Sequence, residues 1–226
     1  MKKPKVIVSW SSGKDCAWTL FKLIAEKQFE VVGLIANFNL DTDKVAMHGC
    51  HRDLVLQQAT TLELPLYEVK LPWPCTNKEY ELRMNDAFGK VKADGITHIA
   101  FGDLFLEDIR DYRIRTVQVS GLKPLFPIWC DTKSTLSLAK EMIETGFRAK
   151  LICVDPKQLP VDFTGREFDN QLLSELPLGV DPCGENGEFH TFCYDGPIFK
   201  KPIAFQSLGR QDRDGFCYMD LVPTSF

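Results

Sequence analysis

The hydrophobic positions of the first 150 or so residues follow two periodicities in alternation. Short apolar and β-branched runs predict buried strands at 5–9, 31–36, 66–71, 97–101 and 150–154. Between these runs, apolar residues at helical spacing predict a helix at 15–27, and a further helix is expected at 52–62. A capping box at 76–79, an acidic first turn from Glu107 and a closing glycine at 146 predict helices at 76–92, 107–119 and 134–144. Strands separated by helices of this length need right-handed crossovers, which produce a mainly parallel sheet covered on both faces. We therefore predict an α/β fold built on a doubly wound sheet.

The pattern changes beyond Asp155. Short β-like runs at 191–194, 203–206 and 218–222 are separated by proline and glycine. We expect a first domain over residues 1–155 and a smaller, irregular region over residues 156–226.

Composition narrows the class of protein. The 226 residues are 44% hydrophobic and 26% charged, which is ordinary for a globular chain. No apolar run reaches the roughly 18 residues of a membrane helix, and the apolar stretch 6–8 is too short for a secretory signal. The eight cysteines are scattered singly and form no C-x-x-C pair. We expect a cytoplasmic protein with reduced cysteines.

The charge is distributed unevenly. The net charge is −4, which argues against an extended nucleic-acid surface. Residues 151–226 hold 6 Lys and Arg against 12 Asp and Glu, a net charge of −6, whereas residues 1–150 hold 21 against 19. The imbalance is typical of solvated surface and also fits two functional halves.

A phosphate-binding loop is predicted between the first strand and the first helix. Residues 9–13 read Ser-Trp-Ser-Ser-Gly, in which all but the tryptophan are small hydroxyl or glycine residues, and Lys14, Asp15 and Cys16 open the helix. Free backbone amides and the helix dipole favour an anion there, and Lys14 adds a positive charge. The loop is not the common P-loop, because Asp15 follows the lysine where that motif needs a hydroxyl.

Ser11-Ser12-Gly13-Lys14-Asp15-Cys16 resembles the S-G-G-K-D-S signature of the PP-loop ATP pyrophosphatases, which cleave ATP between the α and β phosphates. Within that superfamily, nearly the whole chain resembles the diphthine ammonia ligase family, also called ATP-binding family 4. The other segments that carry the resemblance are Met47-His48-Gly49, Gly102-Asp103 with Glu107, Asp108 and Arg113, and Cys183-Gly184-Glu185-Asn186-Gly187-Glu188-Phe189-His190-Thr191. Two positions depart from the signature. Ser12 replaces a glycine, which disfavours a positive φ, and Cys16 replaces a serine, which weakens a donor to phosphate.

The resemblance implies ATP and Mg²⁺ as cofactors in the first domain. The expected nucleotide-binding residues are Ser9, Ser11, Ser12, Gly13, Lys14, Asp15, Cys16, Ala36, Asn37, Phe38, Met47, His48, Gly102, Asp103 and Arg113. Asp15 and Asp103 are the candidate magnesium ligands, because the carboxyl ends of parallel strands meet at one edge. Asp103 can instead cap a helix, and Arg113 can pair with neighbouring acids, as we expect for Arg110 and Arg115.

Met47-His48-Gly49-Cys50-His51 contains three potential metal ligands within four residues. A zinc site would need a fourth ligand, and none is evident nearby. We favour a substrate-facing loop in which His48 touches nucleotide or acceptor, with His51 on a helix surface.

An acidic turn completes the candidate site. Glu185 and Glu188 flank an Asn-Gly turn, and His190 follows in a β-like run. A plain hairpin is the alternative. We predict that Glu185 or Glu188 acts as the base that frees ammonia, with His190, Lys14 and Asp15 completing the catalytic set.

The reaction that the resemblance implies is an AMP-forming ligation. An acceptor carboxylate on a small molecule or protein is adenylated, and ammonia from ammonium displaces AMP to give an amide. Archaeal and eukaryotic family members amidate diphthine, whereas the segment 185–191 resembles a bacterial branch with an uncertain acceptor, one candidate being corrinoid salvage. The alternatives are tRNA thiolation or lysidine formation, and a non-catalytic ATP or AMP sensor. A homodimer is the assembly that the sixteen phenylalanines would support.

Overall fold

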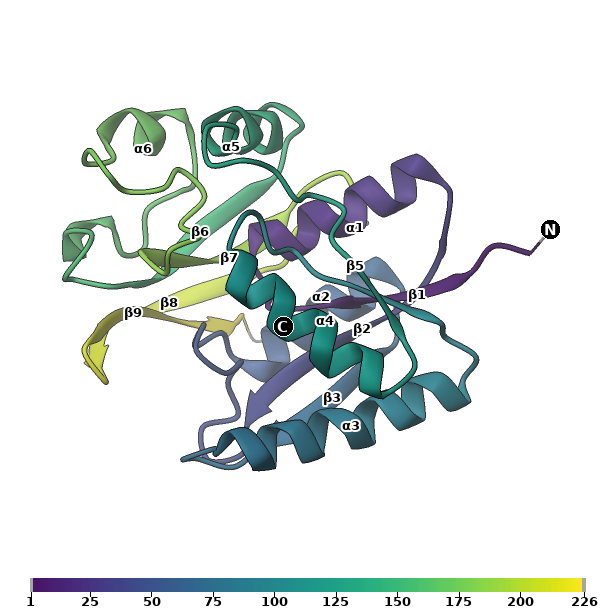
Figure 1. Cartoon of the computed structure of the whole chain (residues 1–226). Coiled ribbons are helices and arrows are strands. Elements are labelled where there is room, and N and C mark those ends of the chain that lie inside the picture. The colour runs from purple at the N-terminus through teal and green to yellow at the C-terminus, as the bar shows by residue number, and fades with distance from the viewer. Residues whose placement is uncertain (1, 225–226) are drawn as a thin grey trace.

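The computed structural model describes residues 2–224, and its first sheet is parallel throughout. Five strands lie in the order β3-β2-β1-β4-β5 (Figure 1). Their bounds are β1 (Lys5–Ser9), β2 (Glu30–Asn39), β3 (Leu66–Leu71), β4 (His98–Ala100) and β5 (Lys123–Leu125). From β1 the chain adds β2 and β3 toward one edge of the sheet, and it then returns to add β4 and β5 on the other side of β1. The predicted doubly wound α/β fold is therefore confirmed.

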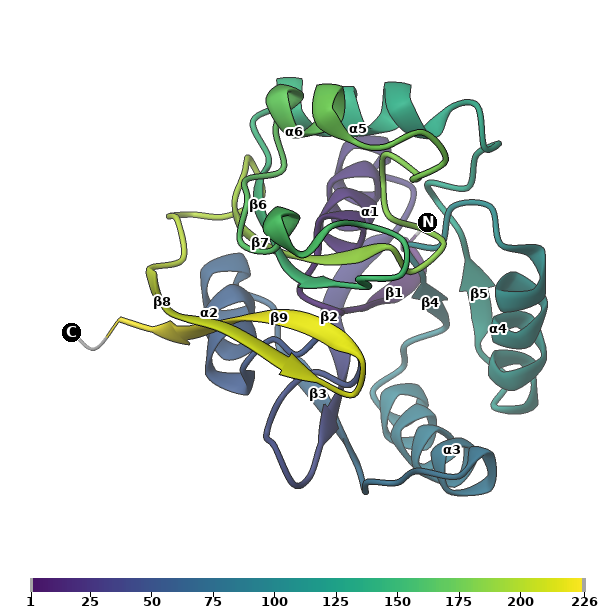
Figure 2. The ribbon, with the colours of Figure 1, turned by 90° about the vertical axis from the view of Figure 1, so that its left-hand side faces the viewer.

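Helices cover both faces of this sheet, because successive strand residues point to opposite sides. The helices around this sheet are α1 (Lys14–Glu26), α2 (Arg52–Leu62), α3 (Asn77–Ala93) and α4 (Glu107–Val119). Two further helices, α5 (Thr135–Glu144) and α6 (Asn170–Glu175), pack against each other. Val6 and Val8 share a core with α1 and α2, whereas Ile7 shares a second core with α3 and α4. Figure 2 shows α3 and α4 together on one side of the sheet, with α2 on the other.

A second, antiparallel sheet lies in the C-terminal region. Its order is β7-β6-β9-β8, with β6 (Arg148–Val154), β7 (Phe189–Asp195), β8 (Phe205–Arg213) and β9 (Phe216–Pro223). It packs against α1, where Phe147 lies edge-on to Trp18 with ring centroids 5.4 Å apart. The two sheets thus share one hydrophobic core, which also contains Phe192 and Leu151.

Two expectations about strands need correction. The run at 150–154 was expected to extend the parallel sheet, but β6 pairs antiparallel with β7 and β9. An apolar run does not specify its partners, and these lie far downstream in the chain. In addition, β5 was not predicted, because it spans only three residues and contains Pro124.

A capping box forms in part at the start of α3. The Thr76 hydroxyl accepts from the backbone N–H of Glu79 at 3.2 Å. The Glu79 carboxylate does not return to the helix start; it accepts from Arg83 at 2.8 Å, one turn along the exposed face. Between residues 2 and 224, none of the helices is both long and apolar enough to cross a membrane. The division of the chain at residue 155 stays a prediction.

Candidate functional site

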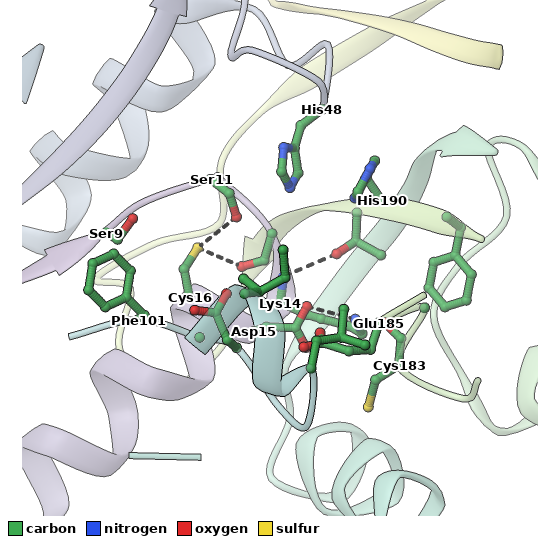
Figure 3. A pocket seen from close by; sticks show the side chains of 18 of the residues that line it. Ser9, Ser11, Lys14, Asp15, Cys16, His48, Phe101, Cys183, Glu185 and His190 are labelled. Atoms are coloured by element: carbon green, nitrogen blue, oxygen red, sulfur yellow. Dashed lines mark hydrogen bonds and ion pairs between the residues drawn. The ribbon is translucent and has the colours of Figure 1, made fainter. Parts of the chain in front are cut away.

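A cavity of about 240 Å³ opens beyond the carboxyl ends of β1 and β4. This is where the strand order reverses, and ligands of open α/β sheets bind at such points. Of the predicted site residues, its lining contains Ser9, Ser11, Gly13, Lys14, Asp15, Cys16, His48, Gly102, Asp103, Arg113, Glu185 and His190. Figure 3 shows side chains from the first loop and from the C-terminal turn around this common space.

The phosphate loop is held in a strained shape. Ser12 has φ 74°, the left-handed conformation that its replacement of glycine disfavours, at an expected cost of about 1–3 kcal/mol. Its carbonyl accepts from the Cys193 N–H at 2.9 Å and from Gln58 Nε2 at 3.0 Å. Gln58 is fully buried; its amide also donates to the Cys193 carbonyl and accepts from Trp10 Nε1 at 2.8 Å. Contacts from α2 and β7 thus fix the loop before any ligand binds.

Lys14 connects the loop to the acidic turn. Its side chain is 2% exposed, and Nζ donates to the Asp15 carboxylate at 2.9 Å and to the Cys183 carbonyl. The ammonium also lies over the rings of Phe168 and Phe189, 5.1 and 5.4 Å from their centroids. Burial would lower the pKa of Lys14, but the charge and hydrogen bond of Asp15, together with the charges of Cys183 and Asp181, outweigh burial and raise this pKa. The lysine therefore keeps its positive charge at the cavity wall.

Asp15 faces the cavity from the first turn of α1, and Asp103 faces it from the loop after β4. Burial raises the pKa of both carboxyls, against the opposing charges of Lys14 and Arg113 respectively. Arg113 Nε lies 3.5 Å from Asp103 Oδ2. Asp15 Oδ1 and Asp103 Oδ2 are buried oxygens without a hydrogen bond, which fits a divalent cation.

A metal held by these two carboxylates would need ligands from the nucleotide. Across residues 2–224, no three His, Cys, Asp or Glu side chains gather as a metal-binding group. Magnesium ordinarily uses one or two carboxylates together with substrate phosphates.

Gly102 allows the two loops to meet. A Cβ at this position would lie 3.0 Å from the carbonyl carbon of Asp15 and 3.1 Å from the Cys16 nitrogen. Both atoms belong to the backbone of the first turn of α1, which cannot move aside without displacing the phosphate loop. A glycine is therefore needed here for the close approach of the loop after β4 to the start of α1.

Glu185 projects into the cavity from the acidic turn. Its Oε1 accepts from the Leu104 N–H at 2.7 Å, which connects the C-terminal turn to the loop after β4. Burial, with the neighbouring charges of Asp15 and Asp103, raises the pKa of Glu185 to about 8. A carboxyl group with this pKa takes up and releases a proton near neutral pH.

Glu188 does not line the cavity. It is 2% exposed, and Oε1 accepts from the Asp181 N–H at 2.8 Å and from Asn186 Nδ2 at 3.0 Å. These contacts hold the turn together, and of the two carboxylates they favour Glu185 for proton transfer.

Two histidines face each other at the edge of the cavity. The ring centroids of His48 and His190 are 4.2 Å apart. Burial lowers the pKa of His48 and lowers that of His190 well below its ordinary value. His48 Nδ1 lies 3.2 Å from the Ala46 carbonyl, so that nitrogen carries the proton and Nε2 is an acceptor. Both rings are neutral at physiological pH.

The remaining predicted residues lie beside this cavity. Asn37 and Met47 line an adjoining cavity of about 310 Å³ that shares Ser9, Ser11, His48 and Arg113 with the first. Ala36 and Phe38 are buried in the core, so only their backbone groups can face a nucleotide. Cys50 is buried, and His51 caps α2 by accepting from the Asp53 N–H at 3.3 Å.

Comparison with known proteins identifies the family. A family model described as diphthamide synthase N-terminal domain matches residues 4–124, more than half of the chain, and one described as diphthamide synthase C-terminal domain matches residues 134–222. The chain belongs to the diphthamide synthase family.

Relatives named diphthine–ammonia ligase align with this member of the diphthamide synthase family. The mouse protein is 28% identical over 224 residues, covering 87% of this chain and 81% of its own length. The Schizosaccharomyces pombe protein is 27% identical over 221 residues, and the chain spans only 36% of its length. The human protein is 37% identical over 108 residues, which are 44% of this chain.

Sequence reasoning missed several residues of this diphthamide synthase family site. The Thr191 hydroxyl accepts from the Lys14 backbone N–H at 3.1 Å, and a Cβ on Gly13 would lie 3.1 Å from the Thr191 carbonyl. Gln58 and the Leu104 amide are further examples. Thr191 belongs to the motif that carried the resemblance, whereas Gln58 sits in an ordinary helix with no local signal.

Proposed function

We propose that this chain is an ATP-dependent, AMP-forming ligase that joins ammonia to an acceptor carboxylate. The observation that supports this most strongly is the common cavity: the phosphate loop and the Glu185 turn, 170 residues apart in the chain, line the same space. We further propose that residues 1–155 bind the nucleotide and 156–226 meet the acceptor. The cysteine pattern supports a cytoplasmic location.

In the first step, an oxygen of the acceptor carboxylate attacks the α-phosphorus of ATP. The bond from that phosphorus to the α,β-bridging oxygen breaks, pyrophosphate leaves, and an acyl-adenylate forms. The amides of the phosphate loop bind phosphate oxygens, and Lys14 and Arg113 stabilise the negative charge that develops on pyrophosphate. Asp15 and Asp103 would hold Mg²⁺, which neutralises phosphate charge when bound.

In the second step, ammonia attacks the acyl carbon and AMP leaves with the bonding electron pair. Ammonium must lose one proton to become a nucleophile, and the attacking nitrogen loses another as the amide forms. Glu185 accepts the first proton, since its pKa of about 8 makes it a stronger base than an ordinary carboxylate. The neutral His190 relays the second proton to solvent, taking it up on one ring nitrogen while it releases a proton from the other.

The identity of the acceptor is a separate part of the proposal. The relatives' names specify diphthine, and we assign to this chain a carboxylate on a small molecule or protein. The segment from Glu185 to Thr191 reads E-N-G-E-F-H-T, whose bacterial-type pattern favours an acceptor linked to corrinoid salvage over diphthine itself.

The alternatives have weaker support. A sensor that does no chemistry needs no proton-transfer groups beside the nucleotide, yet Glu185 and His190 line this cavity. Thiolation needs a reactive thiolate, whereas burial raises the pKa of Cys16 to about 11 and raises that of Cys183 further still.

The test is nucleotide product analysis with α-labelled ATP, Mg²⁺, ammonium and size-separated cell extract. We expect AMP to form with the fractions that contain the acceptor and not in their absence. We expect Glu185→Gln to lower the rate of AMP formation by about 100-fold or more. Tight ATP binding with no AMP from any fraction would favour the sensor. Full activity in Glu185→Gln would exclude the assigned base.

A further inference from the structure

A second cavity opens on the other side of His190. It lies between the loop of residues 39–49 and the β8–β9 hairpin, and its volume is about 460 Å³. His190 lines both this cavity and the phosphate cavity, so the two adjoin at one side chain. A volume of this size suits a small organic ligand.

The strand register defines a row of side chains leading away from the phosphates. His190 is opposite Cys153, Cys153 is opposite Tyr218, and Tyr218 is opposite Gln211. Residues directly opposite in antiparallel strands point to the same face. Two strand spacings separate His190 from Tyr218, which corresponds to about 10 Å.

Arg213 places a positive charge at the far end of this row. It follows Gln211 by two residues on β8, which puts it on the same face of the sheet, and its guanidinium carbon lies 4.3 Å from the centroid of the Tyr218 ring. The other cation of the cavity, Lys44, is neutralised by a salt bridge with Asp220. Within residues 2–224, no carboxylate forms a salt bridge with Arg213, although Asp41 and Asp214 also line the cavity.

The space between the two ends is mainly apolar and aromatic. Trp73 and Met47 are 58% and 65% exposed at its rim, and Phe216 and Tyr218 form the wall on the hairpin side. Such surfaces bind the carbon skeleton of a ligand, whereas a planar guanidinium binds a carboxylate with two parallel hydrogen bonds.

We propose that this cavity is the acceptor site and that the acceptor is a small molecule with two anionic groups joined by a mainly apolar skeleton. One carboxylate reaches past His190 to the α-phosphate, and the other binds Arg213. The inference rests on the proposed function in one respect, the carboxylate nature of the acceptor.

Calorimetric titration tests the proposal without turnover. The probes are unbranched α,ω-dicarboxylates of about six to twelve carbons, a series whose extended lengths bracket 10 Å, each compared with the monocarboxylate of equal length. Titrations are run with and without Mg²⁺ and an ATP analogue whose α,β bridge cannot be cleaved. The variants are Arg213→Gln and, as matched control, Arg210→Gln. Arg210 lies on the same strand but pairs with Asp162 at 3.0 Å and does not line the cavity.

The proposal predicts that at least one dicarboxylate of this series binds wild-type protein about tenfold or more tighter than its monocarboxylate. Arg213→Gln should abolish this preference, and Arg210→Gln should retain it. Equal binding of the two classes, no dicarboxylate binding, or a preference that survives Arg213→Gln would overturn the proposal. Failure of the ATP analogue to bind would count against the proposed function, and the comparison of the two acid classes would still decide the acceptor site.

Discussion

Replacing Glu185 with glutamine should stabilise the fold at alkaline pH while it removes the assigned base. The folded protein raises the pKa of this carboxyl from 4.5 to about 8. Below pH 4.5 the group is protonated in both the folded and unfolded states and contributes nothing. Between pH 4.5 and 8 the unfolded chain releases the proton first, so the free energy of unfolding falls as pH rises. Above pH 8 the carboxylate is charged in both states, so the fold bears the full cost of burying that charge, and Glu185→Gln removes this cost.

The size of the effect follows from the shift. A change of this extent corresponds to at most about 5 kcal/mol. Glu185 is only partly buried, and water at the cavity mouth screens its charge, so we expect about 1–3 kcal/mol at pH 9. Glutamine retains an oxygen that can accept from the Leu104 N–H, so the native contact is preserved. In a chain of this length the gain amounts to about 3–10 °C in Tm.

The assay is thermal unfolding followed by circular dichroism at pH 5, 7 and 9. The control is Glu144→Gln, at the exposed end of α5, which should leave Tm within about 1 °C of wild type at each pH. We expect the difference between Glu185→Gln and wild type to grow with pH. A difference that stays constant or shrinks as pH rises would refute the reasoning about burial at this site.

Three further predictions concern the walls of the site. Gly102→Ala forces a Cβ against the backbone of α1, so it should lower the free energy of unfolding in urea by about 1–3 kcal/mol and raise KM for ATP. The control is Gly89→Ala, which has open space around it in α3 and should raise the free energy of unfolding by about 0.5–1 kcal/mol. Gln58→Ala leaves its buried hydrogen-bond partners unsatisfied and should lower the free energy of unfolding by about 3 kcal/mol. The neighbouring Gln57→Ala should change it little, and equal losses in the two variants would contradict the role of Gln58 in holding the loop. Asp103→Asn should leave unfolding nearly unchanged but raise by about tenfold or more the Mg²⁺ concentration needed for AMP formation, and an unchanged requirement would remove this residue from the metal site.

Local patterns predicted most of the first half of the fold. The helices predicted at 52–62 and 107–119 match α2 and α4 to the residue. For α4 the local signal is the pair of acidic residues in its first turn, because only Val117 of this helix is buried. The phosphate loop was predictable for a similar reason, since a glycine and small hydroxyls before a helix determine the local backbone chemistry. Tertiary pairing was not predictable in this way, and β6 therefore joined the wrong sheet in the prediction.

The candidate site was predicted where a motif is continuous in sequence and missed where it depends on distant contacts. The acidic turn was identified as a unit, but only the fold distinguishes the cavity-facing Glu185 from the turn-stabilising Glu188. Ser12 adopts the positive φ that its side chain disfavours, because Gln58 and Cys193 hold its carbonyl from elements far along the chain. No local pattern contains that information.

The central claim is that nitrogen transfer is coupled to cleavage of ATP between its α and β phosphates. The direct measurement is a mass balance with ¹⁵N-ammonium, ATP and an extract fraction that supports turnover, in which AMP and ¹⁵N-labelled amide are quantified together. The account predicts one labelled amide for each AMP, with pyrophosphate as the other product. AMP without incorporated nitrogen, or ADP in place of AMP, would contradict it.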